Sequence, residues 1–143
     1  MAVDNQSVLR EVKEAFGQVP GWMAAIPPPA VTGFWTLFRD LELGETKIPN
    51  KYKELIGLAV SGATRCRYCA LFHTESAKLN GASDEEIAEA SMMGALTMCA
   101  STFLNAEQID FEKFRSETKD IVAYVKRTQA GKKPASREQP VHA

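Results

Sequence analysis

The sequence lacks the features that mark several classes of protein. Its 143 residues carry 17 Lys and Arg against 18 Asp and Glu, so no basic excess indicates binding to nucleic acid or to an anionic membrane. No uninterrupted apolar run reaches the roughly 18 residues of a transmembrane helix. The opening MAVDNQSVLR has no apolar segment typical of a secretory signal. We therefore expect a cytoplasmic protein that uses neither a membrane nor a nucleic acid.

Cysteine and histidine are scarce, with three and two residues respectively. Cys66, Cys69 and His73 lie together in the stretch RCRYCALFHTES, whereas Cys99 and His142 stand alone. In a reducing cytoplasm a Cys-x-x-Cys pair is more often catalytic or metal-binding than structural. Structural zinc usually takes four ligands, which this chain does not offer in one cluster, so we predict no metal. Cys99 is expected to be a packed core residue.

Patterns typical of β-strands are absent as well. We find no strong alternation of apolar and polar residues and no internal repeat, whereas apolar residues recur at helical spacing. The sequence predicts an all-α bundle of about six helices in one domain, residues 1–128, followed by a disordered tail, residues 129–143. The predicted helices cover residues 7–16, 30–43, 49–61, 66–79, 83–105 and 107–127, with a proline-rich connection at 20–30 and a break at 62–64.

Two local signals help to place the helix ends. Asn80 and Gly81 are typical of a helix C-terminus, and Ser83 with Glu86 forms the pattern of a capping box at the start of the next helix. That next helix is rich in Ala, Met and Gly over residues 88–104. This composition predicts close helix packing and is compatible with a subunit interface.

The two cysteines and the histidine fall on one face of the predicted helix 66–79. At 3.6 residues per turn, Cys66, Cys69 and His73 lie within about 60° of arc. The pair lies at the helix N-terminus, where free N–H groups and the helix dipole stabilise a thiolate. If helices 49–61 and 66–79 pack antiparallel, Glu54 lies level with His73, where its carboxylate would orient the ring and pass protons. Plain packing of two small hydrophobic side chains is the alternative for the cysteines.

These residues resemble the motif of the carboxymuconolactone decarboxylase/AhpD-like superfamily, and most of all its alkylhydroperoxidase branch. The family pattern is a glutamate, eleven residues, and then Cys-x-x-Cys-x-x-x-His, which Glu54, Cys66, Cys69 and His73 match. The flanks KIPNKYKELIGLAVSGATRCRYC and HTESAKLNGASDEEIAEA also resemble the family, so the likeness covers about residues 20–105.

The resemblance implies a role for each of the four residues. Cys69 would attack a peroxide as thiolate, and Cys66 would protonate the leaving group and then form the disulfide. His73 and Glu54 would move protons. An external dithiol or protein reductant would reduce the disulfide, with no cofactor and no metal. The family also implies a homo-oligomer, commonly a trimer or hexamer.

Two neighbouring residues are further candidates. The best-studied alkylhydroperoxidases place a histidine before the second cysteine, where this chain has Tyr68, whose hydroxyl is the candidate substitute in the relay. Phe72 is a candidate wall for an organic peroxide, with ordinary packing as the alternative. Two other functions stay open. One is a redox sensor or disulfide-exchange protein without peroxidase turnover. The other is a lactone enzyme like the carboxymuconolactone decarboxylases, although the decarboxylases themselves lack the cysteine pair.

Overall fold

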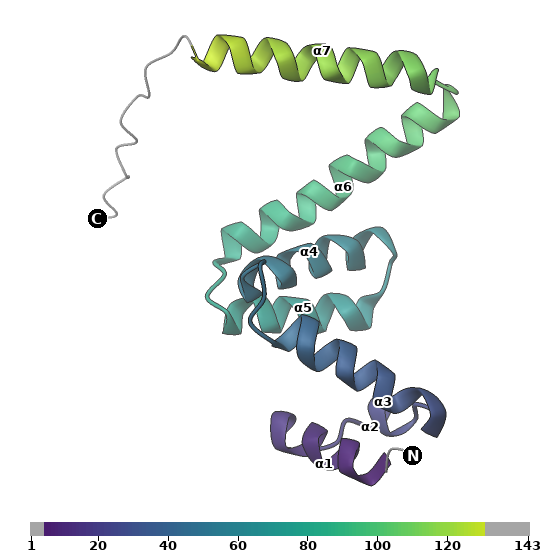
Figure 1. Ribbon diagram of the computed structural model, residues 1–143, viewed down its shortest axis with the longest axis vertical. Helices are drawn as coiled ribbons and strands as arrows, with labels where there is room; N and C mark the ends of the chain where they lie inside the picture. The colour runs from purple at the N-terminus through teal and green to yellow at the C-terminus, as the bar shows by residue number, and fades with distance from the viewer. Residues whose placement is uncertain (1–4, 131–143) are drawn as a thin grey trace, which may run out of the picture. The chain divides into compact units, whose positions relative to one another are not determined.

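The computed structural model describes residues 5–130 and divides the chain into two compact units, Met1–Met98 and Cys99–Ala143. Within the described residues the protein is all-α and has no strand, which confirms the predicted fold class (Figure 1). The predicted tail lies almost wholly in residues 131–143, outside the described residues. The elements are α1 (Asn5–Phe16), α2 (Gly21–Ala24), α3 (Pro28–Leu37), the π-helix η1 (Phe38–Leu43), α4 (Asn50–Ala63), α5 (Arg67–Leu79), α6 (Asp84–Ala106) and α7 (Phe111–Ala130).

The N-terminal helices enclose a small apolar core. Trp35 of α3 is 2 % exposed, and its indole N–H donates to the Glu11 carboxylate of α1 at 2.9 Å. The predicted proline-rich connection 20–30 was wrong in part, because it contains α2 and the first turn of α3. Pro20 and Pro27 stand at the N-cap positions, where a missing N–H costs no hydrogen bond. The buried core members are Val8, Val12, Met23, Val31 and Trp35.

Helices α4 and α5 form an antiparallel hairpin, as predicted, and lie side by side in Figure 1. The predicted break at residues 62–64 begins two residues too early, because α4 continues through Ala63 and only Thr64 lies outside the helix, as its C-cap. The chain then turns at Arg65, which has a φ of +58°. The Arg65 N–H donates to Gly62 O at 3.2 Å and the Cys66 N–H to Ser61 O at 2.9 Å. These two bonds form a Schellman motif, which turns the chain so that Cys66 begins α5.

The start of α6 carries the predicted capping box. The Ser83 N–H donates to Glu86 Oε2 at 2.9 Å, and the Glu86 N–H donates to Ser83 Oγ at 3.2 Å. Lys51 of α4 pairs with the same Glu86 at 2.8 Å. Further along α6, a Cβ at Gly94 would lie 2.8 Å from Ala59 O of α4, so only glycine permits this approach. The predicted close packing of helix 88–104 is present at this point.

Several large apolar side chains of α6 are exposed, among them Met92, Met93 and Leu96. By length and composition α6 is apolar enough to cross a membrane, although it contains no uninterrupted apolar run of 18 residues. Length and hydropathy do not distinguish such a helix from one that packs against protein. Cys99 lies on α6 and is exposed, so its predicted burial in the core was wrong. The core of the first unit forms around other helices, and a small apolar side chain does not by itself select a buried position.

The second unit contains the end of α6 and all of α7. Beyond the end of α6 the chain turns at Gln108, which has a φ of +50°, and the Ile109 N–H donates to Leu104 O at 3.2 Å. The Lys113 N–H donates to Asp110 Oδ1 at 2.7 Å. Helix α7 therefore begins at Phe111, four residues after the predicted start, because Asp110 supplies the cap.

Candidate functional site

Cys66 and Cys69 form a disulfide at the N-terminus of α5. Cys66 is the N-cap residue, and its Sγ accepts the Cys69 N–H at 3.2 Å. Cys66 is partly buried whereas Cys69 is exposed. The Schellman turn at Arg65 orients Cys66 in extended backbone, and one helical turn brings Cys69 back to it. The pair is therefore a local product of the helix start, and Cys69 is its accessible member.

Glu54 of α4 and His73 of α5 face each other across the hairpin, as the register predicted. A hydrogen bond joins His73 Nδ1 and Glu54 Oε2 at 2.8 Å. Glu54 is only 2 % exposed. Burial raises the pKa of Glu54 above its ordinary value, the hydrogen bond to His73 opposes this shift, and the nearby Glu42 raises it further. A carboxyl group with a raised pKa keeps its proton to a higher pH than an exposed glutamate does, and its hydrogen bond to His73 gives that proton a partner.

Gly57 makes room for the imidazole of His73. It lies one turn after Glu54 on α4, and a Cβ built at this position would overlap the His73 ring. The absence of a side chain lets the ring lie flat against the backbone of α4. The sequence offered no local signal for this role, because a glycine inside a helix is equally compatible with a flexible or an exposed position.

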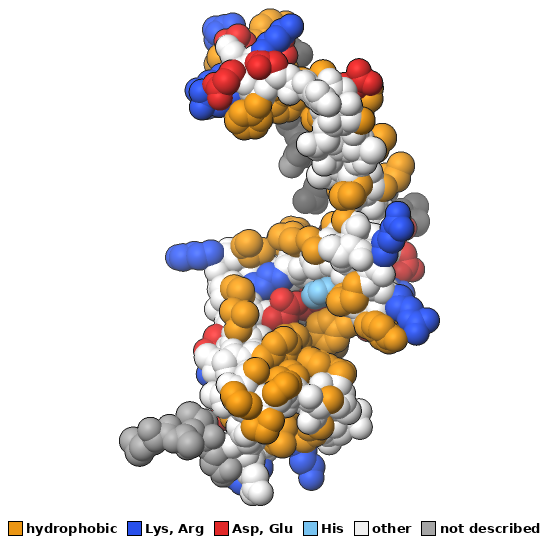
Figure 2. Space-filling view, turned by 90° about the vertical axis from the view of Figure 1, so that its right-hand side faces the viewer, with side chains coloured by type: hydrophobic (Ala, Val, Ile, Leu, Met, Phe, Trp, Pro, Cys, Tyr) orange, Lys and Arg blue, Asp and Glu red, His pale blue; other side chains and the backbone are white. Residues whose placement is uncertain are grey.

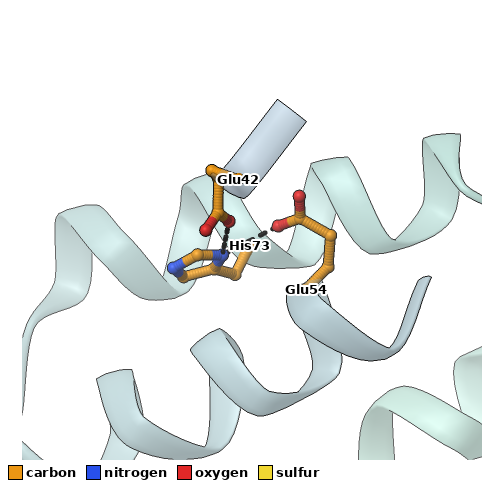
Figure 3. A group of neighbouring side chains, drawn as sticks. All are labelled: Glu42, Glu54 and His73. Carbon is orange, nitrogen blue, oxygen red and sulfur yellow. Dashed lines mark hydrogen bonds and ion pairs between the residues drawn. The ribbon is translucent and has the colours of Figure 1, made fainter. Parts of the chain in front are cut away.

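Glu42 is the site residue that sequence reasoning missed. It comes from the π-helix η1, and its Oε1 lies 3.5 Å from His73 Nδ1, so both carboxylates face the same ring nitrogen (Figure 3). A π turn adds a residue to the helical repeat, and a helical wheel at 100° per residue then assigns the wrong face to the residues that follow. An acidic residue between Leu41 and Leu43 was the one available signal.

A pocket of about 400 Å³ opens between η1, α4 and α5. Cys69, His73 and Glu42 line it, whereas Cys66 and Glu54 do not. Figure 2 shows acidic side chains and a histidine together among hydrophobic ones on this face of the molecule. The apolar walls are Leu41, Ile48, Ile56 and Val60. Cys69, the imidazole of His73 and the Glu42 carboxylate thus share one partly apolar space.

Tyr68 and Phe72 lie on a different side of α5. Tyr68 is 73 % exposed, and its hydroxyl accepts a hydrogen bond from Arg67 at 3.0 Å. Both aromatic residues line a separate depression, and neither lines the pocket of Cys69 and His73. Phe72 does contact the His73 ring edge-on, with 5.4 Å between ring centroids, and it also packs on Phe38. Phe72 therefore supports the imidazole from outside the pocket.

Glu42, Glu54 and His73 also form the arrangement of a cation site. One donor atom from each lies within 4.8 Å of the others. Two carboxylates and an imidazole are ligands that zinc and other divalent metals accept. The same three groups can instead share protons, and a hydrogen bond already joins two of them, His73 and Glu54.

Comparison with known proteins matches this architecture to one family. The family model described as "Carboxymuconolactone decarboxylase family" matches residues 29–109, more than half of the chain and all of η1, α4 and α5. The chain belongs to the carboxymuconolactone decarboxylase family. No curated protein matches it. The resemblance inferred from Glu54, Cys66, Cys69 and His73 is therefore confirmed at the level of the family.

Two solved structures resemble this member of the carboxymuconolactone decarboxylase family. One is the alkylhydroperoxidase AhpD core from Rhodospirillum rubrum, with 27 % identity and a TM-score of 0.67 over 76 % of this chain and 84 % of that one. The other is a structural-genomics protein from Methanobacterium thermoautotrophicum, with 32 % identity and a TM-score of 0.53 over 62 % of this chain and 97 % of that one. The fold is thus the AhpD-like one.

Proposed function

We propose that this chain is a thiol-dependent peroxidase, or more broadly a thiol–disulfide oxidoreductase, which reduces peroxides with its Cys66–Cys69 pair. The observation that carries the proposal is one shared pocket. The exposed Cys69 lines it together with His73, and the ring of His73 is hydrogen-bonded to the buried Glu54. The likeness to an alkylhydroperoxidase core supports the same reaction class.

The peroxide step assigns a separate role to each sulfur. The Cys69 thiolate attacks one peroxide oxygen, the O–O bond breaks, and Cys69 becomes a sulfenic acid. The alkoxide or hydroxide that leaves takes a proton from the Cys66 thiol. The Cys66 thiolate then attacks the Cys69 sulfur, so that the disulfide forms and hydroxide leaves, to be protonated through His73 and Glu54. In sum, one peroxide and two thiols give an alcohol or water, a second water and the disulfide.

The positions of the two cysteines fit this assignment. Cys69 is exposed and lines the pocket, so a peroxide can reach it, whereas Cys66 is partly buried at the N-cap. In the return step an external dithiol attacks Cys69, and Cys66 leaves as a thiolate. The Cys69 N–H that donates to Cys66 Sγ stabilises this leaving group. The apolar pocket walls suit an organic peroxide better than a strongly charged substrate.

Homo-oligomerisation is part of the proposal. Helix α6 carries the exposed apolar side chains of Met92, Met93 and Leu96, and a homo-oligomer would cover them. The family resemblance implies a trimer or hexamer, which sedimentation measurements would distinguish from a monomer. The cytoplasmic location stays a prediction.

The decisive experiment is peroxide consumption by the purified protein under excess dithiol. We expect repeated turnover in the wild type, none in Cys69→Ser, and none beyond a single oxidation in Cys66→Ser. Cys99→Ser is the matched control, because it removes an exposed thiol outside the pair and should retain full turnover.

Other outcomes of this experiment lead to the alternative functions. A wild type that is oxidised once and stops would contradict peroxidase turnover and favour a sensor or disulfide-exchange protein. Activity on a lactone that survives Cys69→Ser would favour a decarboxylase-like enzyme instead, because that chemistry would need His73 and Glu54 without the thiols.

A further inference from the structure

Two carboxylates compete for one nitrogen of the imidazole. His73 Nδ1 lies 2.8 Å from Glu54 Oε2 and 3.5 Å from Glu42 Oε1, as the dashed lines in Figure 3 mark. When Nδ1 carries its hydrogen, it donates to Glu54, the closer partner. Oε1 of Glu42 is then buried with no hydrogen-bond partner of its own. A buried carboxylate oxygen without a hydrogen-bond partner is costly, so this oxygen is available to accept a hydrogen bond from the imidazole or from a donor in the pocket.

The position of Glu42 is built by the first turns of α4. Lys53 donates three hydrogen bonds, to the carbonyls of Leu41 at 2.7 Å and Gly44 at 2.6 Å, and to Asn50 Oδ1 at 3.0 Å. Asn50 Nδ2 in turn donates to Leu43 O at 3.0 Å. These bonds hold the end of η1 on both sides of Glu42. Because Lys53 directly precedes Glu54, the same turn of α4 positions both carboxylates.

The two carboxylates differ in their access to the pocket. Glu42 lines the pocket with Cys69 and His73, whereas Glu54 is buried behind the ring and does not line it. The charged or titratable groups that face Glu42 are Lys53 and Glu54 from α4 and His73 from α5. The Lys53 ammonium is occupied by its three acceptors. Glu42 therefore lies next to both the Glu54–His73 pair and the pocket, where it can accept or give a proton that moves from one to the other.

We propose that Glu42 is a positioning and proton-holding residue of this site, which shares a proton with the Glu54–His73 pair and exchanges it with the pocket where Cys69 reacts. The inference rests on the proposed function. When Cys69 loses its thiol proton, the sulfur becomes a thiolate and the imidazole becomes an imidazolium. Glu42 and Glu54 together then face that cation, so that the positive charge is offset from two sides.

The test compares Glu42→Gln with Glu45→Gln. Glu45 is an exposed glutamate three residues further on that does not line the pocket, so its variant removes one nearby acidic charge without touching His73. Carboxyl NMR titration of Glu54 is the first readout, in metal-free protein. Glu42→Gln is expected to lower the apparent pKa of Glu54, because a like charge is removed, and Glu45→Gln is expected to leave it unchanged.

Peroxide turnover is the second readout. In Glu42→Gln we expect kcat to fall about tenfold, which is less than the 10²–10⁴ of a group that transfers the proton itself. We expect KM to stay unchanged and the acid limb of the pH profile to shift, with partial rescue in Glu42→Asp. Equal Glu54 titration in the wild type and Glu42→Gln would overturn the proposal, even if peroxidase turnover is found. Dependence on Glu42 that appears only with added Zn²⁺ would also overturn it, in favour of a metal site.

The two readouts separate this proposal from the proposed function. A wild type without peroxide turnover contradicts the peroxidase, yet the Glu54 titration still tests the coupling to Glu42. Conversely, turnover that is lost in Cys69→Ser but unaffected in Glu42→Gln supports the peroxidase and contradicts a role for Glu42.

Discussion

Gly57 of α4 lies directly against the imidazole of His73, and a Cβ at position 57 would overlap the ring. Gly57→Ala is therefore expected to displace His73 and weaken its hydrogen bond to Glu54. Overpacking of this kind costs about 1–3 kcal/mol, partly offset by the better helix propensity of alanine. Chemical denaturation would measure the loss of stability, and peroxide consumption the loss of activity.

Gly62→Ala is the control on the same helix. A Cβ at Gly62 meets no atom within 4 Å, so this change should raise stability by up to about 1 kcal/mol and leave activity intact. If both variants were equally stable and active, Gly57 would have no role in seating the imidazole.

Glu54 should make stability depend on pH. Its pKa is raised in the folded protein above the ordinary value of 4.5, mainly by burial. The folded state therefore binds the proton more tightly than the unfolded state, so this contribution is fully present below about pH 4.5 and is lost as the pH rises through the raised pKa.

Urea unfolding of the wild type and Glu54→Gln across this pH range would measure the effect. The free energy of unfolding of the wild type relative to the variant should fall with increasing pH. A relative stability that stays flat or rises with pH would contradict the prediction. Glu75→Gln, which removes an exposed glutamate from α5, controls for the change of net charge.

Reduction of the disulfide should leave the protein folded. Cys66 and Cys69 are only three residues apart, and closing so short a loop stabilises a protein by about 2 kcal/mol in the chain-entropy model. This is small beside the roughly 5–15 kcal/mol of a typical domain. Denaturation with and without a reductant would measure the difference, and a transition that disappears on reduction would show that the pair has a structural role.

Lys53 should contribute more to stability than its neighbour Lys51. Lys53→Met removes three hydrogen bonds that hold the end of η1, and we expect a loss of about 2–3 kcal/mol. Lys51 makes one partly exposed ion pair with Glu86, so Lys51→Met should cost at most about 1 kcal/mol. Thermal unfolding of the two variants compares them directly, and an equal loss would mean that the bonds of Lys53 do not secure η1.

The sequence by itself determined the parts of this site that depend on spacing along one helix or one hairpin. Cys66, Cys69 and His73 share a face because the helical repeat places residues three and four apart one above the other. The Ser83–Glu86 capping box was predictable for the same reason, since both partners lie within one turn. The position of Glu54 opposite His73 was predictable once the two helices were taken as an antiparallel hairpin.

Only the tertiary structure decided which other residues surround the two cysteines, His73 and Glu54. A π turn in η1, secured by Lys53, brings Glu42 to the imidazole. Gly57 admits the ring, while Tyr68 lies outside the pocket. These outcomes depend on how one element packs against another. An added residue in a π turn changes which side chains face the neighbour, and a missing Cβ lets a neighbouring ring come close. The local sequence carries the spacing within each helix, and the packing of η1 against α4 and α5 selects which side chains meet.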